Sequence, residues 1–220
     1  VAFNKPAGIL TTTSDPHGRA CLQPWMRRLP PTIFPVGRLD RATTGLLLLT
    51  DDGDLAHVLL RPHFHVEKRY HVRVAGEVTA GDSRLDRLRD GVEIGSGPAS
   101  AIEARPVASM AGSTVLRLTI DEGRNRVVRR MCRRADLRLE HLHRAAVGPL
   151  WLEGVREGDW RILTGGEVDA LWQAAGGRDA ARARKVEALS EQATRWRDEN
   201  RPHQRLEAWL EQHADTFLGE

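Results

Sequence analysis

The sequence has few cysteines and few aromatic residues, and it contains no long apolar run. Among its 220 residues, Cys21 and Cys132 are the two cysteines, and aromatic residues make up 5% of the chain, with Tyr70 as the single tyrosine. Two cysteines exclude a disulfide scaffold and favour the reducing cytoplasm. No stretch approaches the roughly 18 consecutive apolar residues of a transmembrane helix. The sequence therefore predicts a cytoplasmic protein with no membrane partner, built as one large domain or two small subdomains.

A strong net charge is also lacking, so the distribution of charge is more informative than its total. The formal net charge is +3, from 33 Lys and Arg against 30 Asp and Glu. Residues 173–220 hold eight basic and nine acidic side chains, whereas residues 1–172 hold 25 and 21. Within the larger part, residues 124–134 contain six arginines and no acid. This local cationic segment indicates an anionic partner.

Motifs that hold nucleotides or metals are absent from the sequence. It has no Walker loop, no dinucleotide fingerprint and no HExxH helix. The pairs His63/His65 and His141/His143 have a spacing that would place both members on one face of a strand. Neither pair has an assignable third or fourth metal ligand, so structural or surface histidines are favoured. We expect no metal and no cofactor.

Apolar periodicity predicts an α+β chain with a helical extension. Asp51 or Asp52 can cap a helix that carries Leu55, Val58 and Leu59 on one face. The expected strands are 46–50, 68–74, 114–120 and 141–151, and further helices are expected at 85–88 and from residue 165 onward. Beyond Trp172, apolar residues recur at helical spacing in two segments separated near residue 201. The balanced charge of this extension favours packing or oligomerisation over RNA binding.

A helix predicted over residues 125–135 has two contrasting faces. At 100° per residue, Val127, Val128 and Met131 belong to an aliphatic arc of about 140°. The opposite arc consists of arginines, namely Arg126, Arg129, Arg130, Arg133 and Arg134. A charged helix face is usually only solvated, but arginines without interleaved acids repel one another. Because phosphate fits guanidinium geometry, a phosphate-binding face and a solvated face are the two open interpretations.

Asp40 lies in a loop between Arg38 and Arg41, where the chain passes from one element to the next. A carboxylate in such a position can act as nucleophile or base on an electrophilic sugar carbon. The alternative is a loop aspartate that caps a turn or pairs with an arginine.

Five motifs occur in order along residues 1–172. The longest is Gly37-Arg38-Leu39-Asp40-Arg41-Ala42-Thr43-Thr44-Gly45, which continues through Leu46-Leu47-Leu48-Leu49-Thr50-Asp51-Asp52-Gly53. The other four are Asn4-Lys5-Pro6, Lys68-Arg69-Tyr70, the segment 122–131 and the segment 158–164. This set resembles the RsuA/RluB/RluE/RluF family of ribosomal-RNA pseudouridine synthases.

The resemblance implies a pseudouridine synthase fold in which two α+β subdomains share a mixed, largely antiparallel sheet with a central cleft. The catalytic domain would span residues 1–172, followed by the helical extension 173–220. Asp40 is implied to be the catalytic aspartate, Tyr70 to stack on the target uracil, and Arg129 to pair with Asp40. Basic residues expected to contact RNA are Lys5, Arg38, Arg41, Arg124, Arg126, Arg130, Arg133 and Arg134.

The implied activity is the isomerisation of a specific uridine in ribosomal RNA, free or in a pre-ribosomal particle. The N1–C1′ bond breaks, the flipped base turns, and C5 joins C1′. No group is added or lost, which agrees with the absence of cofactor motifs. Stacking on an aromatic ring recovers about 1–3 kcal/mol of the energy that base flipping requires. Attack of the aspartate on C1′ and removal of the C2′ proton are both compatible with the sequence.

Two features depart from the family pattern. Val127 stands where members commonly carry Gln, and Lys5-Pro6 lies too near the start of the given sequence for an S4 RNA-binding domain to fit between Val1 and this motif. Two expectations are open: such a domain precedes Val1, or the chain resembles the S4-lacking RluE type. Two other functions are considered: a catalytically idle RNA-binding or ribosome-assembly protein, and a hydrolytic nucleosidase or base glycosylase. The intact set of Asp40, Tyr70 and Arg129 argues against the idle protein.

Overall fold

The computed structural model describes residues 1–179 and 183, and the unit discussed below spans Val1–Arg178. The two helical segments predicted on either side of residue 201 lie outside the described residues. None of the helices within the described part is long and apolar enough to cross a membrane.

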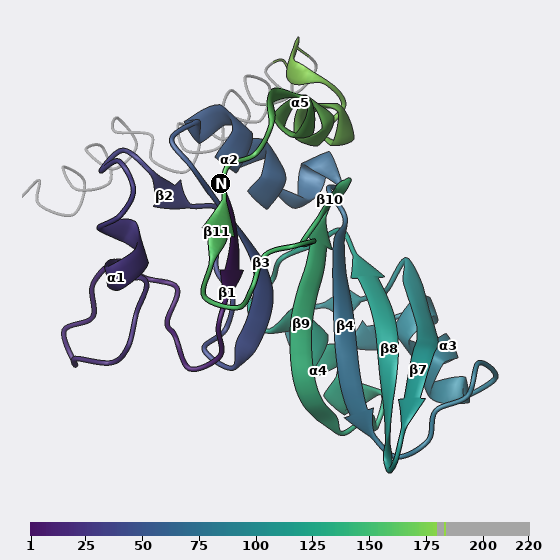
Figure 1. Ribbon diagram of the computed structural model, residues 1–220. Helices are drawn as coiled ribbons and strands as arrows, with labels where there is room; N and C mark the ends of the chain where they lie inside the picture. The colour runs from purple at the N-terminus through teal and green to yellow at the C-terminus, as the bar shows by residue number, and fades with distance from the viewer. Residues whose placement is uncertain (180–182, 184–220) are drawn as a thin grey trace, which may run out of the picture. The chain divides into compact units, whose positions relative to one another are not determined.

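The centre of this unit is a nine-stranded sheet with the strand order β11-β1-β3-β9-β4-β8-β7, in which β10 also pairs with β9 and β2 with β3 (Figure 1). The strands are β1 (Ala2–Lys5), β2 (Phe34–Pro35), β3 (Thr43–Thr50), β4 (Lys68–Ala75), β7 (Glu103–Met110), β8 (Ser113–Ile120), β9 (Leu139–Val147), β10 (Leu150–Trp151) and β11 (Trp160–Arg161). A separate hairpin consists of β5 (Val92–Glu93) and β6 (Pro98–Ala99). In the nine-stranded sheet β3 and β9 are parallel, and the other pairs are antiparallel. The prediction of an α+β fold with a mixed, largely antiparallel sheet is confirmed.

The helices are α1 (Gln23–Met26), α2 (Gly53–Leu60), α3 (Ser83–Asp90), α4 (Val127–Arg134) and α5 (Gly165–Ala174), with a short 3-10 helix η1 at Pro62–Phe64. Asp52 caps α2, because its side chain accepts hydrogen bonds from the backbone amides of Asp54 and Leu55. The predicted aliphatic face of α4 is confirmed, since Val127, Val128 and Met131 are buried.

The sheet has a separate apolar core on each side of the β3–β9 pair. On one side, alternate residues of β4 and β8 such as Val72 and Leu118 pack with buried residues of α3 and α4, which lie on the same face of these strands (Figure 1). On the other side, Phe3, Leu47 and Leu22 form a second core. Two cores joined through a parallel strand pair are consistent with the predicted subdomains.

Parts of the fold differ from the sequence predictions. His63 and His65 do not share a strand face, because His63 belongs to η1 and His65 follows it with a φ of +51°. Strand β7 was not predicted, and Ala104 is its one buried residue. A strand with so little apolar alternation carries no periodic signal.

Candidate active site

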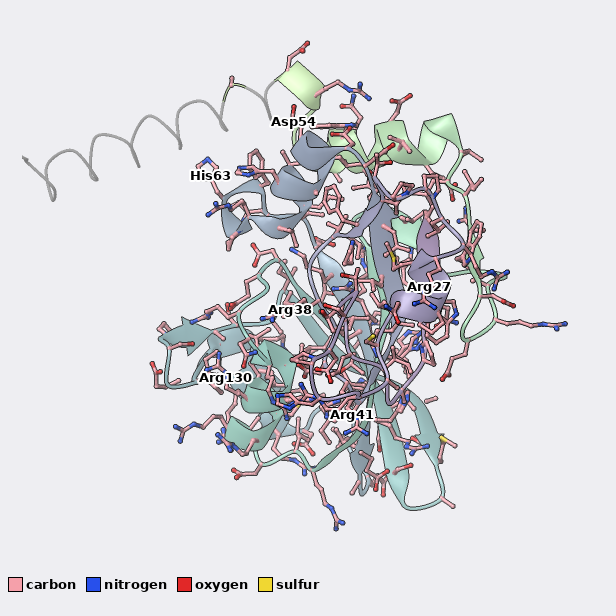
Figure 2. All side chains as sticks on the ribbon, turned by 90° about the vertical axis from the view of Figure 1, so that its left-hand side faces the viewer. Arg27, Arg38, Arg41, Asp54, His63 and Arg130 are labelled. Atoms are coloured by element: carbon pink, nitrogen blue, oxygen red, sulfur yellow. The ribbon has the colours of Figure 1, made fainter. Side chains whose placement is uncertain are left out.

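A cavity of about 710 Å³ lies where the two parts of the sheet meet, and it contains the three predicted catalytic side chains. Asp40 precedes β3, Tyr70 lies on β4, and Arg129 lies on α4. Residues separated by up to 89 positions are thus brought to one cavity. Figure 2 looks onto the side of the molecule that carries Arg38 and Arg41, which also line this cavity.

The backbone on both sides of Asp40 is fixed by hydrogen bonds. The Thr11 hydroxyl donates to the carbonyl of Leu39 at 2.8 Å and accepts from the amide of Leu39 at 3.2 Å. After the aspartate, the amide of Thr43 donates to the carbonyl of Asp40 at 2.9 Å, which closes a turn leading into β3. These contacts fix the backbone from which the carboxylate of Asp40 extends.

Arg129 connects α4 to the Asp40 loop. Its Nε donates to Asp40 Oδ2 at 3.1 Å, and its Nη2 donates to the carbonyl of Ala42 at 3.2 Å and to Thr43 Oγ1 at 3.1 Å. A guanidinium that donates to the carboxylate and to two neighbouring oxygens restricts the orientation of that carboxylate. Arg126 approaches the same Oδ2 at 3.5 Å from the N-terminus of α4. The expected ion pair between Arg129 and Asp40 is therefore present, while the catalytic roles remain predictions.

Tyr70 takes part both in the core and in the cavity wall. It is 8% exposed and packs in the same core as Val72 and Leu118. It also lines the cavity that contains Asp40. Core packing and base stacking are both compatible with this position.

The basic residues predicted to contact RNA fall into two groups. The prediction that Lys5 contacts RNA is corrected. Its side chain is fully buried, and its ammonium donates to the carbonyls of Pro6 at 2.7 Å and Ile9 at 2.8 Å. It stabilises a loop rather than presenting a charge to RNA. Arg124 and Arg130 likewise donate to the β5–β6 hairpin, through the carbonyls of Ser96 and Ile94 respectively.

The remaining members of the predicted set are exposed: Arg38, Arg41, Arg126, Arg133 and Arg134. Of the five arginines predicted on this face of α4, Arg126, Arg133 and Arg134 are exposed. Arg129 and Arg130 instead donate hydrogen bonds within the protein. Arg133 also lines a second cavity of about 470 Å³ at the C-terminal end of α4.

Two further cations in the cavity were given no role in the site by the sequence analysis. Lys68 on β4 and Arg144 on β9 both line it and are buried. Burial, reinforced by the charge of Arg144, lowers the pKa of Lys68 to about 8. The alternation of β4 could have identified Lys68, because residues 68 and 70 share a face.

The paired histidines have no metal-like arrangement. His143 and His141 lie near the Thr44 hydroxyl, with nitrogen–oxygen distances of 2.9 Å and 3.4 Å. Burial lowers the pKa of His143, and the neighbouring His71 and His141 lower it further. Within residues 1–179 and 183, no cluster of three or more His, Cys, Asp or Glu residues could hold a metal ion.

Comparison with known proteins gives consistent matches. The profile of the family described as RNA pseudouridylate synthase matches residues 1–134. An RNA pseudouridine synthase of Mycobacterium tuberculosis is 41% identical over 179 residues, covering 80% of this chain and 70% of the relative. The ribosomal large subunit pseudouridine synthase B of Bacillus subtilis is 35% identical, covering 76% of this chain and 68% of the relative. A crystal structure of a pseudouridylate synthase has a TM-score of 0.64 at 29% identity, covering 77% of this chain and 72% of that one, so the predicted fold is confirmed.

Proposed function

The chain belongs to the family of RNA pseudouridylate synthases, and we propose that it isomerises one uridine of ribosomal RNA with Asp40 as its catalytic carboxylate. Membership makes it an isomerase that acts on RNA. The choice of ribosomal RNA rests on relatives such as the ribosomal large subunit pseudouridine synthase B of Bacillus subtilis.

The observation that carries the role of Asp40 is its contact with Arg129 inside a cavity. The carboxylate is 23% exposed, and Arg129 Nε lies 3.1 Å from Oδ2. It is therefore accessible to a ligand but restricted in orientation, as a group that reacts with a sugar carbon must be. Tyr70 lines the same cavity and offers an aromatic face to a flipped base.

The reaction places different demands on the protein at each stage. The target uridine leaves its helix and enters the cavity, where Tyr70 stacks on the base. The Asp40 carboxylate then attacks C1′ or removes the C2′ proton, and the N1–C1′ bond breaks with its electron pair on the base. The uracil turns, and C5 bonds to C1′ as the Asp40–C1′ bond breaks or, in the second route, as Asp40 returns the proton to C2′. C5 then loses its proton and N1 gains one. Arg129 keeps the carboxylate aimed during these steps.

The substitution Asp40→Asn tests this proposal. It retains the shape of the side chain but removes the nucleophile or base, so we expect pseudouridine formation to fall by at least about 10⁴-fold. RNA binding should remain, because the exposed arginines are unchanged. The assay is single-turnover pseudouridine formation in ribosomal RNA isolated from cells that lack the gene, with binding measured in parallel.

Asp136→Asn serves as a matched control, because Asp136 is an exposed aspartate paired with Arg87 at 2.8 Å. It should retain the wild-type rate. Near wild-type conversion by Asp40→Asn would contradict the role of Asp40. Free uracil as the product would instead indicate a hydrolase, and neither product from the wild-type protein would indicate an RNA-binding protein without activity.

A further inference from the structure

Two buried cations lie side by side in the wall of the cavity. Lys68 is 6% exposed and Arg144 is 8% exposed. They come from neighbouring antiparallel strands, and Arg144 lies opposite Tyr70 in the register of β4 and β9. Lys68 and Tyr70 are two residues apart on β4, so both side chains point to the same face of the sheet.

Neither of these two cations has an ion-pair partner within the described part of the protein. Asp121 and Glu122 raise the pKa of Lys68, but they pair with His65 and Arg124. Lys68 Nζ donates to the carbonyl of Asp121 at 3.4 Å, and Arg144 Nε donates to the carbonyl of Leu46 at 2.8 Å. Neither forms an ion pair with a carboxylate of residues 1–179 or 183. Burying two like charges together is unfavourable unless an anion compensates them. The arrangement therefore indicates that a ligand supplies negative charge at this position.

The position of the pair distinguishes a base from a phosphate as its ligand. Arg38, Arg41 and Arg126 are exposed where they line the cavity, which suits contact with the RNA backbone. Lys68 and Arg144 are buried and adjoin Tyr70, which suits the base itself. Along a strand, Cα atoms two residues apart are separated by about 6.6 Å, so a lysine side chain can reach the edge of a ring stacked on Tyr70.

We propose that Lys68, with Arg144 beside it, stabilises the negative charge that uracil acquires when its N1–C1′ bond breaks. This inference rests on the proposed function. Cleavage leaves the bonding electron pair on the base, where the charge is shared among N1, O2 and O4. The Lys68 ammonium donates a hydrogen bond to one of these carbonyl oxygens and keeps its proton. The base becomes neutral again when C5 bonds to C1′ and the carboxylate of Asp40 is released, or the proton is returned to C2′. Loss of the C5 proton and gain of one at N1 then leave it neutral.

The first test compares Lys68→Met with Lys68→Arg in single-turnover kinetics on uridine-containing ribosomal RNA. Methionine has nearly the same shape but no charge, so we expect the rate of the chemical step to fall by about 10² to 10³-fold, as when one oxyanion donor is removed. The dissociation constant for RNA should change by less than about threefold, because the phosphate contacts remain. Arginine keeps a positive charge and should restore much of the rate.

The leaving group provides a second test. Fluorine at C5 withdraws electrons, so 5-fluorouracil leaves as an anion with less help from the protein. We therefore compare the factor by which Lys68→Met slows cleavage of the N-glycosidic bond in the two RNAs. This factor should be at least about ten times larger for uridine RNA than for 5-fluorouridine RNA. A role of Lys68 in folding alone would slow both substrates equally.

The pH profile gives a third readout. The groups that influence Lys68 are Arg144 on β9, which lowers its pKa, and Asp121 and Glu122 after β8, which raise it. Because the pKa of Lys68 is about 8, its ammonium is lost as the pH rises through that value. The wild-type rate should fall there, and the fall should disappear in Lys68→Arg, whose guanidinium stays charged.

The thermal stability of Lys68→Met gives a fourth readout. Removing a buried charge without an anionic partner should leave the thermal midpoint of Lys68→Met equal to or above that of the wild type. The proposal is overturned if Lys68→Met keeps the wild-type rate, if it slows both substrates equally, or if it weakens RNA binding without slowing chemistry, as a phosphate contact would. An inactive wild-type protein would instead contradict the proposed function, which separates the two failures.

Discussion

Tyr70 is the single tyrosine of the chain, so its ring can be observed without interference from other tyrosines. In a protein carrying isotope-labelled tyrosine, one ring signal is expected. If the ring stacks on a base, this signal should shift when RNA containing the target uridine binds. We further expect Tyr70→Leu, which retains apolar volume, to weaken the complex with flipped uridine by about 1–3 kcal/mol, and Tyr70→Phe to bind like the wild type.

Core packing makes a different prediction for Tyr70. In that case the signal would not change when RNA binds, and Tyr70→Leu would lower the thermal midpoint without altering affinity. Thermal unfolding of each variant, measured beside RNA binding, therefore separates the two roles. An RNA of the same sequence with cytidine at the target position is the matched control for the ligand.

The side chains of the site differ in how far the sequence could predict them. The resemblance predicted that Arg129 pairs with Asp40, and the structure contains this ion pair. The basic residues were predicted by charge alone, which cannot distinguish an exposed cation from one held by carbonyl oxygens. Lys5 was therefore assigned to RNA, although its ammonium is buried. Lys68 was not predicted as a site residue, although the alternation of β4 places it on the same face as Tyr70. Its proximity to Arg144 could not be predicted, because that depends on the pairing of β4 with β9.

At the scale of elements, the parallel pairing of β3 with β9 brings the two parts of the sheet together. Gly45 lies in this pair with a φ of +104°, and a Cβ atom there would lie 2.3 Å from the carbonyl oxygen of Arg144. A side chain would be strained in that conformation and would also push the strands apart. We expect Gly45→Ala to lower the free energy of unfolding by several kcal/mol, about 1–3 kcal/mol of it from the backbone conformation. Denaturant unfolding measures this change.

Gly53→Ala is the control for that substitution. Gly53 begins α2, and a Cβ atom there would have no neighbour within 4 Å. Alanine at a compatible helical position stabilises a protein by about 0.4–1 kcal/mol. Equal unfolding free energies for Gly45→Ala and the wild type would show that the β3–β9 pair tolerates a side chain.

The elements themselves were predicted where their residues carry a periodic pattern. The buried run in β3, the alternation in β4 and β8, and the two faces of α4 are all visible in sequence. Strand β11 was not predicted, because its two residues form a strand only through pairing with β1. Pairings between segments so distant along the chain depend on tertiary contacts, which local periodicity does not encode.

At the scale of the whole described unit, its arginines occupy different environments. Arg129 is bound to Asp40, Arg130 to the β5–β6 hairpin, and Arg133 is exposed at the end of α4. Arg73 is exposed on the opposite face of β4 from Tyr70 and pairs with Glu140 at 3.3 Å. Affinity for RNA should depend on the exposed arginines around the cavity and α4, and little on Arg73.

The salt dependence of RNA binding tests this difference. Each phosphate contact releases counterions, so its loss reduces the slope of log affinity against log salt by about 0.7–0.9. We expect the double variant Arg133→Gln, Arg134→Gln to bind more weakly at low salt and to lose about 1.4–1.8 from that slope. Arg73→Gln should leave both quantities unchanged, because its guanidinium lies on the other face of the sheet. Titration of labelled ribosomal RNA at several salt concentrations measures the slopes, and equal slopes for the double variant and the wild type would mean that this end of α4 is only solvated.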